Sequence, residues 1–508
     1  MKGAVAAGHR LTAEAGARVL QEGGNAVDAC VAASFAAWVT ESPLTGPGAG
    51  GFALVWPADG RPPRVADFFV LTPGLGRPVE PGAQMHAIDV GFGGDSETTQ
   101  VFRIGEASCA VPGTARGLES VHASYGRLPW PELLQPAIEL ARGGVEVSRE
   151  QAHLHAILDL ILRHAGEGRR LYSRPDGMRL VPGDTLRLPD LGETLERVAA
   201  GGASVLYRGE LADALVATVG GTITKQDLAS YRVSWRRPVR VRFREHEVVS
   251  NPPPSSGGIL IAYSLDLLER VGRPGDLRAL VEVMDQTNRA RTEDFVQGLH
   301  SEGYLERFMA VEALESVALD VGSRLGSTTH LCVLDGDGGC ATVTCSNGSC
   351  SGVIVPGTGV HLNNMLGEED LNPLGFHRHE PGRRIPSMMA PTVVLRDGKP
   401  EVALGSAGSN RIRSAILQTI LAVIDGGLGA QDAVEAPRVH FEGGVLEAEP
   451  GVDEGALDAL EREGWQVQRW RERNLYFGGA QAVARAADTG ELSGGGDPRR
   501  GGVAVLVE

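Results

Sequence analysis

The spacing of apolar residues near the start of the chain predicts two consecutive helices. Apolar side chains recur at helical spacing over residues 11–22, and Gly23 and Gly24 follow directly, so we expect an amphipathic helix to end there. Asn25 can then cap a second helix, with Asp28 as its partner in a capping box. Because this second helix is apolar on nearly every side, we expect it to be buried between layers.

The pattern up to the middle of the chain favours helices, with two interruptions. A glycine-rich turn over residues 46–51 precedes a short strand over residues 52–56. Three successive prolines, residues 252–254, remove backbone donors, and we expect residues 248–258 to form a rigid extended turn outside any helix or strand. Helices are predicted within residues 105–165, 182–232 and 259–270.

Beyond about residue 326 the apolar period changes to two, which is typical of strands. Segments 329–334 and 340–345 flank Asp335-Gly336-Asp337-Gly338, and this arrangement predicts a hairpin. A second hairpin is predicted around Asp397-Gly398. Because helices dominate the first part and hairpins the second, the predicted fold class is α+β, with antiparallel strands covered by helices. Further strands are expected at 481–485 and 503–507, and a helix at 411–425.

Composition and charge narrow the functional classes. The chain of 508 residues contains 69 glycines, roughly twice the usual ~7% share, but without the three-residue period of collagen. With 48 basic and 64 acidic residues, its formal net charge is −16. An acidic surface repels phosphate, so we expect neither nucleic acid nor an anionic membrane as a partner. No long apolar run and no secretory signal stand out, so a cytoplasmic location is expected.

The motifs predict no metal and no cofactor. Six cysteines are too few for a disulfide scaffold, and Cys340, Cys345 and Cys350, five residues apart, match no zinc pattern. The glycines of residues 46–51 match a dinucleotide fingerprint only formally. A helix precedes them and a strand follows, which reverses the order that this fingerprint requires.

The strand start at Thr328 has two interpretations. In the run Gly326-Ser327-Thr328-Thr329-His330, the threonines are ordinary β-branched residues that open a strand, and residue types alone favour this view. The alternative treats Thr328 as a nucleophile. A threonine hydroxyl is weak without an adjacent base, and a free N-terminal amine can be that base. This chemistry requires cleavage of the bond between Ser327 and Thr328.

Short motifs occur along nearly the whole chain. They are Gly23 to Ala29, Gly48 to Phe52, Ala110 to Thr114, Gln135 to Arg142, Ile223 to Leu228, Pro252 to Gly258, Thr328 to His330, Leu362 to Asn364, Pro386 to Thr392 and Gly405 to Ser409. Each motif is weak alone, but so many in the same order are highly specific. Together they resemble the γ-glutamyltranspeptidase family of N-terminal-nucleophile hydrolases.

The resemblance implies a four-layer αββα sandwich and a precursor that cuts itself before Thr328. The products would be a helix-rich large subunit, residues 1–327, and a hairpin-rich small subunit, residues 328–508. The freed amine of Thr328 would act as base for its own hydroxyl. A γ-glutamyl group from glutathione or a related amide would pass through an acyl-enzyme to water or an amino acid. Beyond this small-molecule substrate and its own two subunits, a homodimer is the remaining candidate partner.

The resemblance also assigns roles around Thr328. Gly408 and Ser409 occupy the family's paired-glycine position, whose backbone N–H groups form the oxyanion hole, and Ser409 replaces the second glycine. A backbone N–H survives that change. Ser346 stands where the family has a threonine that hydrogen-bonds the nucleophile.

The donor pocket departs from the family pattern. Phe69 occupies the position of the arginine that grips the donor's carboxylate, and a phenyl ring cannot replace a bidentate clamp. Arg77 is a candidate substitute. Ser387 matches the first serine of a family pair, and Glu368 or Glu369 would bind the donor's amino group. Two alternatives stay open: an acylase for a different acyl amide, such as a glutaryl amide, and a homologue that stays whole and only binds.

Overall fold

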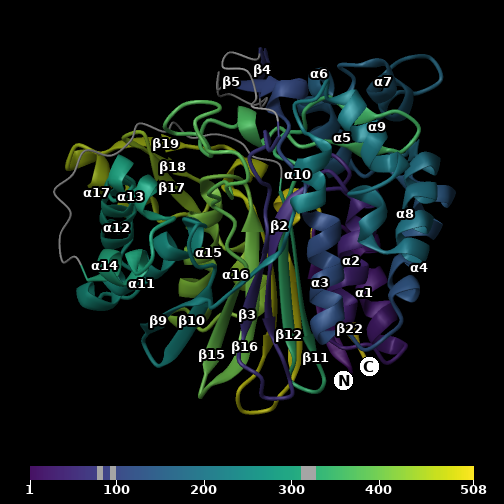
Figure 1. The fold of residues 1–508 in the computed structure, drawn as a ribbon. Helices are drawn as coiled ribbons and strands as arrows, with labels where there is room; N and C mark the ends of the chain where they lie inside the picture. Colours follow the sequence, from purple (N-terminus) through teal and green to yellow (C-terminus); the bar gives the residue numbers. More distant parts are fainter. Residues whose placement is uncertain (77–83, 92–98, 311–327) are drawn as a thin grey trace.

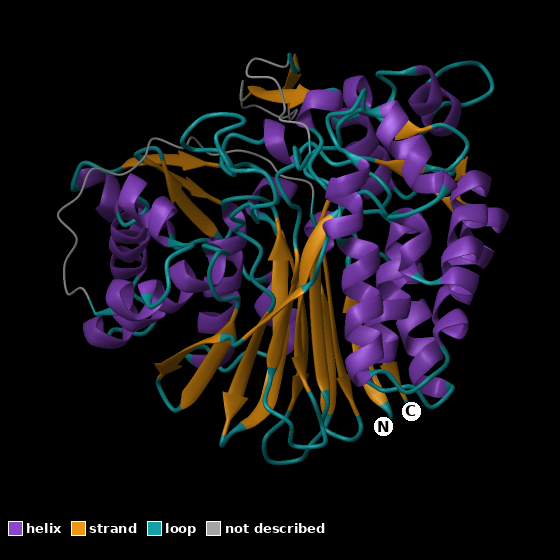
Figure 2. Cartoon of the chain, in the orientation of Figure 1, coloured by secondary structure: helices purple, strands orange, loops and turns teal. Residues whose placement is uncertain are grey.

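Two β-sheets form the centre of the molecule, with helices against the outer side of each (Figures 1 and 2). The computed structural model describes residues 1–76, 84–91, 99–310 and 328–508, so Arg77 and Ser327 lie outside the described residues. All neighbouring strands within these two sheets are antiparallel.

The first sheet has seven strands in the order β22-β1-β11-β12-β2-β3-β8. Its strands are β1 (Gly3–Ala7), β2 (Gly50–Trp56), β3 (Arg64–Phe68), β8 (Ser234–Arg236), β11 (Thr329–Asp335), β12 (Cys340–Ser346) and β22 (Val503–Val507). The second sheet has six strands in the order β21-β20-β16-β15-β10-β9. Its strands are β9 (Val239–Phe243), β10 (His246–Ser250), β15 (Thr392–Arg396), β16 (Lys399–Ala407), β20 (Gly479–Arg485) and β21 (Leu492–Gly496).

Strand β11 is buried on both faces because each face packs into a different hydrophobic core. Leu331 and Val333 join the core beneath the helices, and Cys332 and Leu334 join the core between the two sheets. Successive side chains of a strand point to opposite faces, so period-two spacing delivers apolar groups to both sides. Contacts of β11 with β16 and β20 bring the two sheets together.

Helices pack on the outer side of each sheet (Figure 1). Beside the first sheet lie α1 (Arg10–Gln21), α2 (Ala26–Thr40), α3 (Thr114–Tyr125), α4 (Trp130–Gly143) and α8 (Pro189–Gly201), and beside the second lie α11 (Gly257–Val271), α12 (Leu277–Arg289) and α15 (Arg411–Ile424). The predicted capping box is confirmed, since Asn25 and Asp28 exchange hydrogen bonds at the start of α2. Every residue of α2 is buried, as its apolar composition predicts.

Shorter elements surround this centre. The remaining helices are α5 (Arg149–Ile157), α6 (Asp159–Leu162), α7 (Gly166–Tyr172), α9 (Glu210–Thr218), α10 (Lys225–Ser230), α13 (Glu293–Gly298), α14 (Tyr304–Met309), α16 (Ala430–Glu435) and α17 (Glu454–Arg462). The remaining strands are β4 (His86–Gly91), β5 (Thr99–Ile104), β6 (Val145–Glu146), β7 (Thr185–Leu186), β13 (Ile354–Val355), β14 (Val360–His361), β17 (Val439–Glu442), β18 (Val445–Ala448) and β19 (Gln466–Arg469).

One predicted segment is partly wrong. Residues 248–250 belong to β10, and α11 begins at Gly257, so the turn between them is shorter than expected. Val248 and Val249 are buried and pair with β15 and β9. The burial of Val248 and Val249 between two neighbouring strands favours a strand here. The prolines that follow only end this strand.

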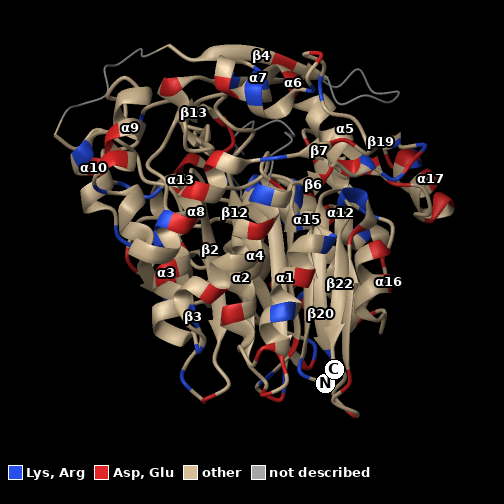
Figure 3. Ribbon diagram, turned by 90° about the vertical axis from the view of Figure 1, so that its right-hand side faces the viewer, with Lys and Arg blue, Asp and Glu red and all other residues tan. Residues whose placement is uncertain are grey.

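Charged residues are interspersed over the outer helices and loops, while the central strands contain few of them (Figure 3). Within the described residues, no helix combines the length and the apolar character needed to cross a bilayer.

Candidate active site

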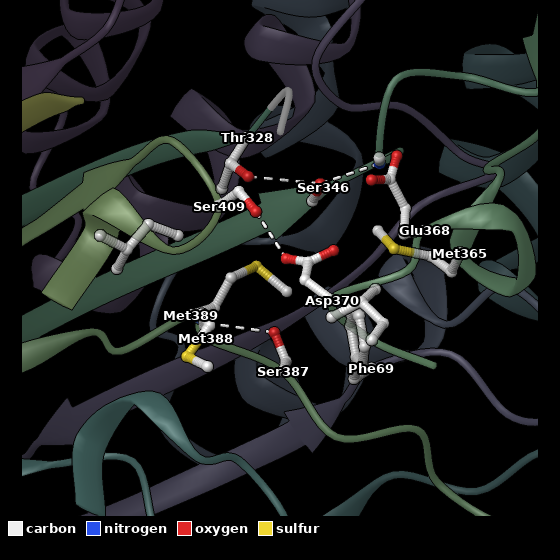
Figure 4. Close-up of a pocket in the computed structure, with 13 residues that line it drawn as sticks. Phe69, Thr328, Ser346, Met365, Glu368, Asp370, Ser387, Met388, Met389 and Ser409 are labelled. Carbon is white, nitrogen blue, oxygen red and sulfur yellow. Dashed lines mark hydrogen bonds between the residues drawn. The ribbon is translucent and has the colours of Figure 1, made fainter. Parts of the chain in front are cut away.

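Thr328 and Ser346 face each other at the ends of two paired strands. Thr328 directly precedes β11, and β12 ends at Ser346. The register pairs Thr329 with Cys345, so the residues beyond that pair are also opposite. The Thr328 Oγ1 hydroxyl donates to Ser346 Oγ at 3.4 Å, and the backbone N–H of Gly348 donates to Ser346 Oγ at 2.9 Å (Figure 4). The structure therefore brings together the predicted nucleophile and its predicted hydroxyl partner.

A pocket of about 340 Å³ opens onto Thr328 (Figure 4). Its polar side chains are hydroxyls and two carboxyls, and its remaining side chains are apolar. No Lys, Arg or His belongs to its described lining. The lining residues are Phe69, Thr328, Ser346, Gly348, Met365, Glu368, Asp370, Leu371, Ser387, Met388, Met389, Ser409 and Ile412.

The turn between β16 and α15 places Ser409 at this pocket. Gly408 has φ 125° and Ser409 has φ 52°, so both lie in the region that favours glycine. The Ser409 side chain has a partner that compensates for this conformation, since its Oγ donates to Asp370 Oδ2 at 2.5 Å. This hydrogen bond joins the predicted oxyanion turn to the loop that carries the pocket's carboxyls.

Glu368 is the predicted donor-binding acid that lines the pocket. Its Oε1 accepts hydrogen bonds from the Ser349 N–H at 3.1 Å and the Ser349 hydroxyl at 3.2 Å. Burial, and then the charge of Asp370, raise the pKa of Glu368 to about 8. At neutral pH this carboxyl is therefore mostly protonated.

Glu369 points elsewhere. It pairs with Arg103 at 3.0 Å, with both side chains about a third exposed, and it does not line the pocket. The sequence left Glu368 and Glu369 as equal candidates, and the structure brings only Glu368 to Thr328. Asp370 was missed. Its only sequence signal is the acidic run Glu368-Glu369-Asp370, in which alternate residues face the pocket.

Phe69 stacks on Phe52, with ring centroids 5.5 Å apart, and its ring lines the pocket. Behind it, the Phe69 carbonyl accepts from the Tyr231 hydroxyl at 2.8 Å and from Arg384. Arg384 is itself paired with buried Asp67 at 3.1 Å. The guanidinium of Arg384 is thus committed to the backbone and the carboxylate behind Phe69 and does not replace a carboxylate clamp.

Asp67 has a second partner, since Arg236 Nε lies 2.8 Å from Asp67 Oδ2. A fully buried carboxylate needs such partners. Ser387 lines the pocket, and its Oγ accepts from the Met389 N–H at 3.1 Å.

The site thus consists of a buried threonine hydroxyl beside a second hydroxyl, at a pocket bordered by a turn of positive φ. The family model of gamma-glutamyltranspeptidase matches residues 12–507. The chain belongs to this family, whose members are hydrolases and transferases, as the sequence motifs predict.

The similar proteins include both acylases and glutathione hydrolases. The acylase ACY 1 proenzyme of Pseudomonas sp. (strain SE83) is 34% identical, covering 100% of this chain and 94% of that protein. The glutathione hydrolase proenzyme of Bacillus subtilis (strain 168) is 30% identical, covering 99% and 91%. The crystal structure of cephalosporin acylase from Bacillus halodurans matches with a TM-score of 0.77 at 26% identity, covering 100% and 96%.

Proposed function

We propose that this protein is a self-cleaving proenzyme and that mature Thr328 is the nucleophile of an amidohydrolase and acyltransferase. The observation that carries the proposal is the Thr328–Ser346 hydroxyl pair at the pocket. Cleavage before Thr328 gives subunits 1–327 and 328–508, which together form a four-layer αββα sandwich. The proenzyme names of the relatives support this maturation.

The reaction needs no group beyond the chain itself. The α-amine of mature Thr328 takes the proton of its own hydroxyl as Oγ1 attacks the amide carbonyl. The N–H groups of Gly408 and Ser409 stabilise the oxyanion, and Ser346 holds Oγ1 in place. Collapse expels the amine of the donor, which takes the proton. Water or an amino acid then attacks the acyl-enzyme and restores the threonine hydroxyl.

The donor is a γ-glutamyl-type amide that is held through its amino group. The described pocket offers Glu368 and Asp370 but no cation, so it attracts an ammonium group and repels a carboxylate. Phe69 and the methionines suit an apolar acyl chain. A pocket with both carboxyls and apolar side chains accounts for a chain whose relatives include both glutathione hydrolase and acylase proenzymes.

Mass spectrometry of purified protein tests the maturation. We expect two chains separated at Ser327–Thr328, and a single uncleaved chain for Thr328→Ala. Thr328→Ser keeps a hydroxyl and an amine and should still be cleaved. A wild-type protein that stays whole after prolonged incubation would instead favour the homologue that only binds.

Four p-nitroanilides of matched chain length test the donor. γ-Glutamyl carries an amine and a carboxylate, 4-aminobutyryl only the amine, glutaryl only the carboxylate, and butyryl neither. We expect the highest kcat/KM with 4-aminobutyryl and the lowest with glutaryl. A preference for the glutaryl compound would establish the acylase alternative and refute recognition through the amine.

A homodimer and a cytoplasmic location remain predictions, to be checked by sedimentation and cell fractionation.

A further inference from the structure

Two consecutive arginines at the end of the 3-10 helix η5 (Pro498–Arg500) have opposite surroundings. Arg499 pairs with Glu449 and, at 3.1 Å, with Asp497. Arg500 has no carboxylate within 4.0 Å in the described part of the chain, and its buried Nε and Nη2 atoms have no hydrogen-bond partner there. The charge of Arg499 is thus neutralised by carboxylates, and the charge of Arg500 is not.

Arg500 packs against the backbone beside the Gly408–Ser409 turn. A Cβ on Gly479 would lie 2.5 Å from Arg500 Cδ, so a glycine at this position makes room for the side chain. A Cβ on Gly408 would lie 3.6 Å from Arg500 Nη2, so the guanidinium is in van der Waals reach of the turn. Arg500 does not belong to the lining of the donor pocket.

Arg500 remains charged in this position. Burial, and then the charge of Arg411, lower its pKa to about 10, while Asp497 and Glu41 oppose the decrease. Glu41 lines the same cavity of about 490 Å³ as Arg500 and accepts a hydrogen bond from Thr329. Burial raises the pKa of Glu41 to about 7, so near neutrality this carboxyl is only partly ionised. The charge of Arg500 is incompletely balanced in the resting protein.

We propose that Arg500 is a positioning residue that stabilises the oxyanion through the Gly408–Ser409 turn. A buried cation without a full partner is costly, and that cost decreases when negative charge develops nearby. Attack by Thr328 creates such a charge on the substrate carbonyl oxygen, at the same turn. A fixed charge in a dry site needs no reorganisation to favour that state. The proposal rests on Thr328 being the nucleophile.

Charge-altering variants of Arg500 test this role. Arg500→Gln removes the charge and Arg500→Lys keeps it. For Arg500→Gln we expect kcat to fall on the order of tenfold, less than the loss of a direct oxyanion donor, with KM within about twofold. Arg500→Lys should recover most of kcat. Arg473→Gln is the matched control, because Arg473 is exposed and interacts with Glu435, through a 3.9 Å ion pair and a 3.2 Å hydrogen bond to its carbonyl, and it should leave kcat unchanged.

A boronic acid inhibitor separates this electrostatic role from a structural one. It forms a tetrahedral anion on the threonine hydroxyl, so Arg500→Gln should weaken its binding by the same factor as kcat, whereas a slowly cleaved alkyl amide of the same acyl group, whose carbonyl oxygen carries no charge, should bind unchanged. Equal kcat and equal boronate affinity in the wild type, Arg500→Gln and Arg500→Lys would refute the proposal. If Arg500→Gln does not fold, Arg500→Met is the uncharged member of the comparison. An inactive, uncleaved wild type would refute the nucleophile itself.

Discussion

Two hydroxyl centres in this molecule resemble catalytic sites in different ways. Thr328 donates a hydrogen bond to Ser346 and lines a pocket. Ser414, on α15, bonds His440 Nδ1 at 2.7 Å, and His440 Nε2 bonds Glu442 at 3.1 Å. By residue type, the second centre is the one that looks like a catalytic triad.

The difference between them is access and charge. Ser414 does not line the donor pocket, and burial lowers the pKa of His440, which therefore resists accepting a proton. Burial alone would raise the pKa of Glu442, but His440 and two arginines hold it at about 2. Glu442 also accepts from Asn410, the residue after the oxyanion turn, at 3.0 Å. The triad-like group ties α15 to β17, whereas the base proposed for Thr328 is the amine that chain cleavage would free.

Removing each hydroxyl gives the largest contrast. Thr328→Ala should lose at least about a thousandfold in kcat/KM, because the nucleophile is gone. Ser414→Ala should stay within about twofold. Amide turnover by both purified variants measures the difference. A comparable loss in Ser414→Ala would show that the buried triad takes part in the chemistry.

Ser346 tests the hydroxyl pair itself. Ser346→Ala removes the partner of Thr328 Oγ1, and we expect kcat to fall roughly ten- to hundredfold. Ser346→Thr keeps the hydroxyl and should restore most of the rate. Steady-state kinetics on fully cleaved protein separates this effect from slow maturation. Equal rates for the alanine and threonine variants would remove Ser346 from the mechanism.

His440 should matter for stability and not for turnover. His440→Leu leaves the charge of Glu442 without one of its hydrogen bonds, and we expect a loss of about 2 kcal/mol in the free energy of unfolding. Denaturant titration measures this loss, and kcat of the folded variant should be unchanged. A variant whose kcat falls while its free energy of unfolding is unchanged would contradict a purely structural role for His440.

The smallest effect concerns the protonation of Glu368. Its pKa rises from an ordinary value of 4.5 to about 8 on folding, so folding stability from this group is complete below 4.5 and is lost as the pH rises towards 8. Glu368→Gln should therefore stabilise the protein more at pH 8 than at pH 5. It should also abolish a severalfold decrease in KM for the amine-bearing donor across pH 7–9. Glu369→Gln is the control and should show neither change.

Much of the sheet could be predicted from sequence, because turn residues fixed its register. The Asp335 to Gly338 turn sets β11 against β12, and this alone places Ser346 opposite Thr328. The loop that carries Glu368 and Asp370 has no apolar period, so nothing indicated which carboxyls face the pocket. The position of Arg500 could not be predicted from sequence either, because it packs against Gly479 and Gly408, more than 20 and 90 residues away in the chain.

The strand order has a consequence for how the mature enzyme could be assembled. In the seven-stranded sheet, β1 of residues 1–327 lies between β11 and β22 of residues 328–508. In the six-stranded sheet, β10 of the first segment pairs with β15 of the second. Neither segment contains all the strands of either central sheet. Two genes that encode the segments separately should therefore yield insoluble fragments unless they are synthesised together, and the proposed cut would have to follow folding.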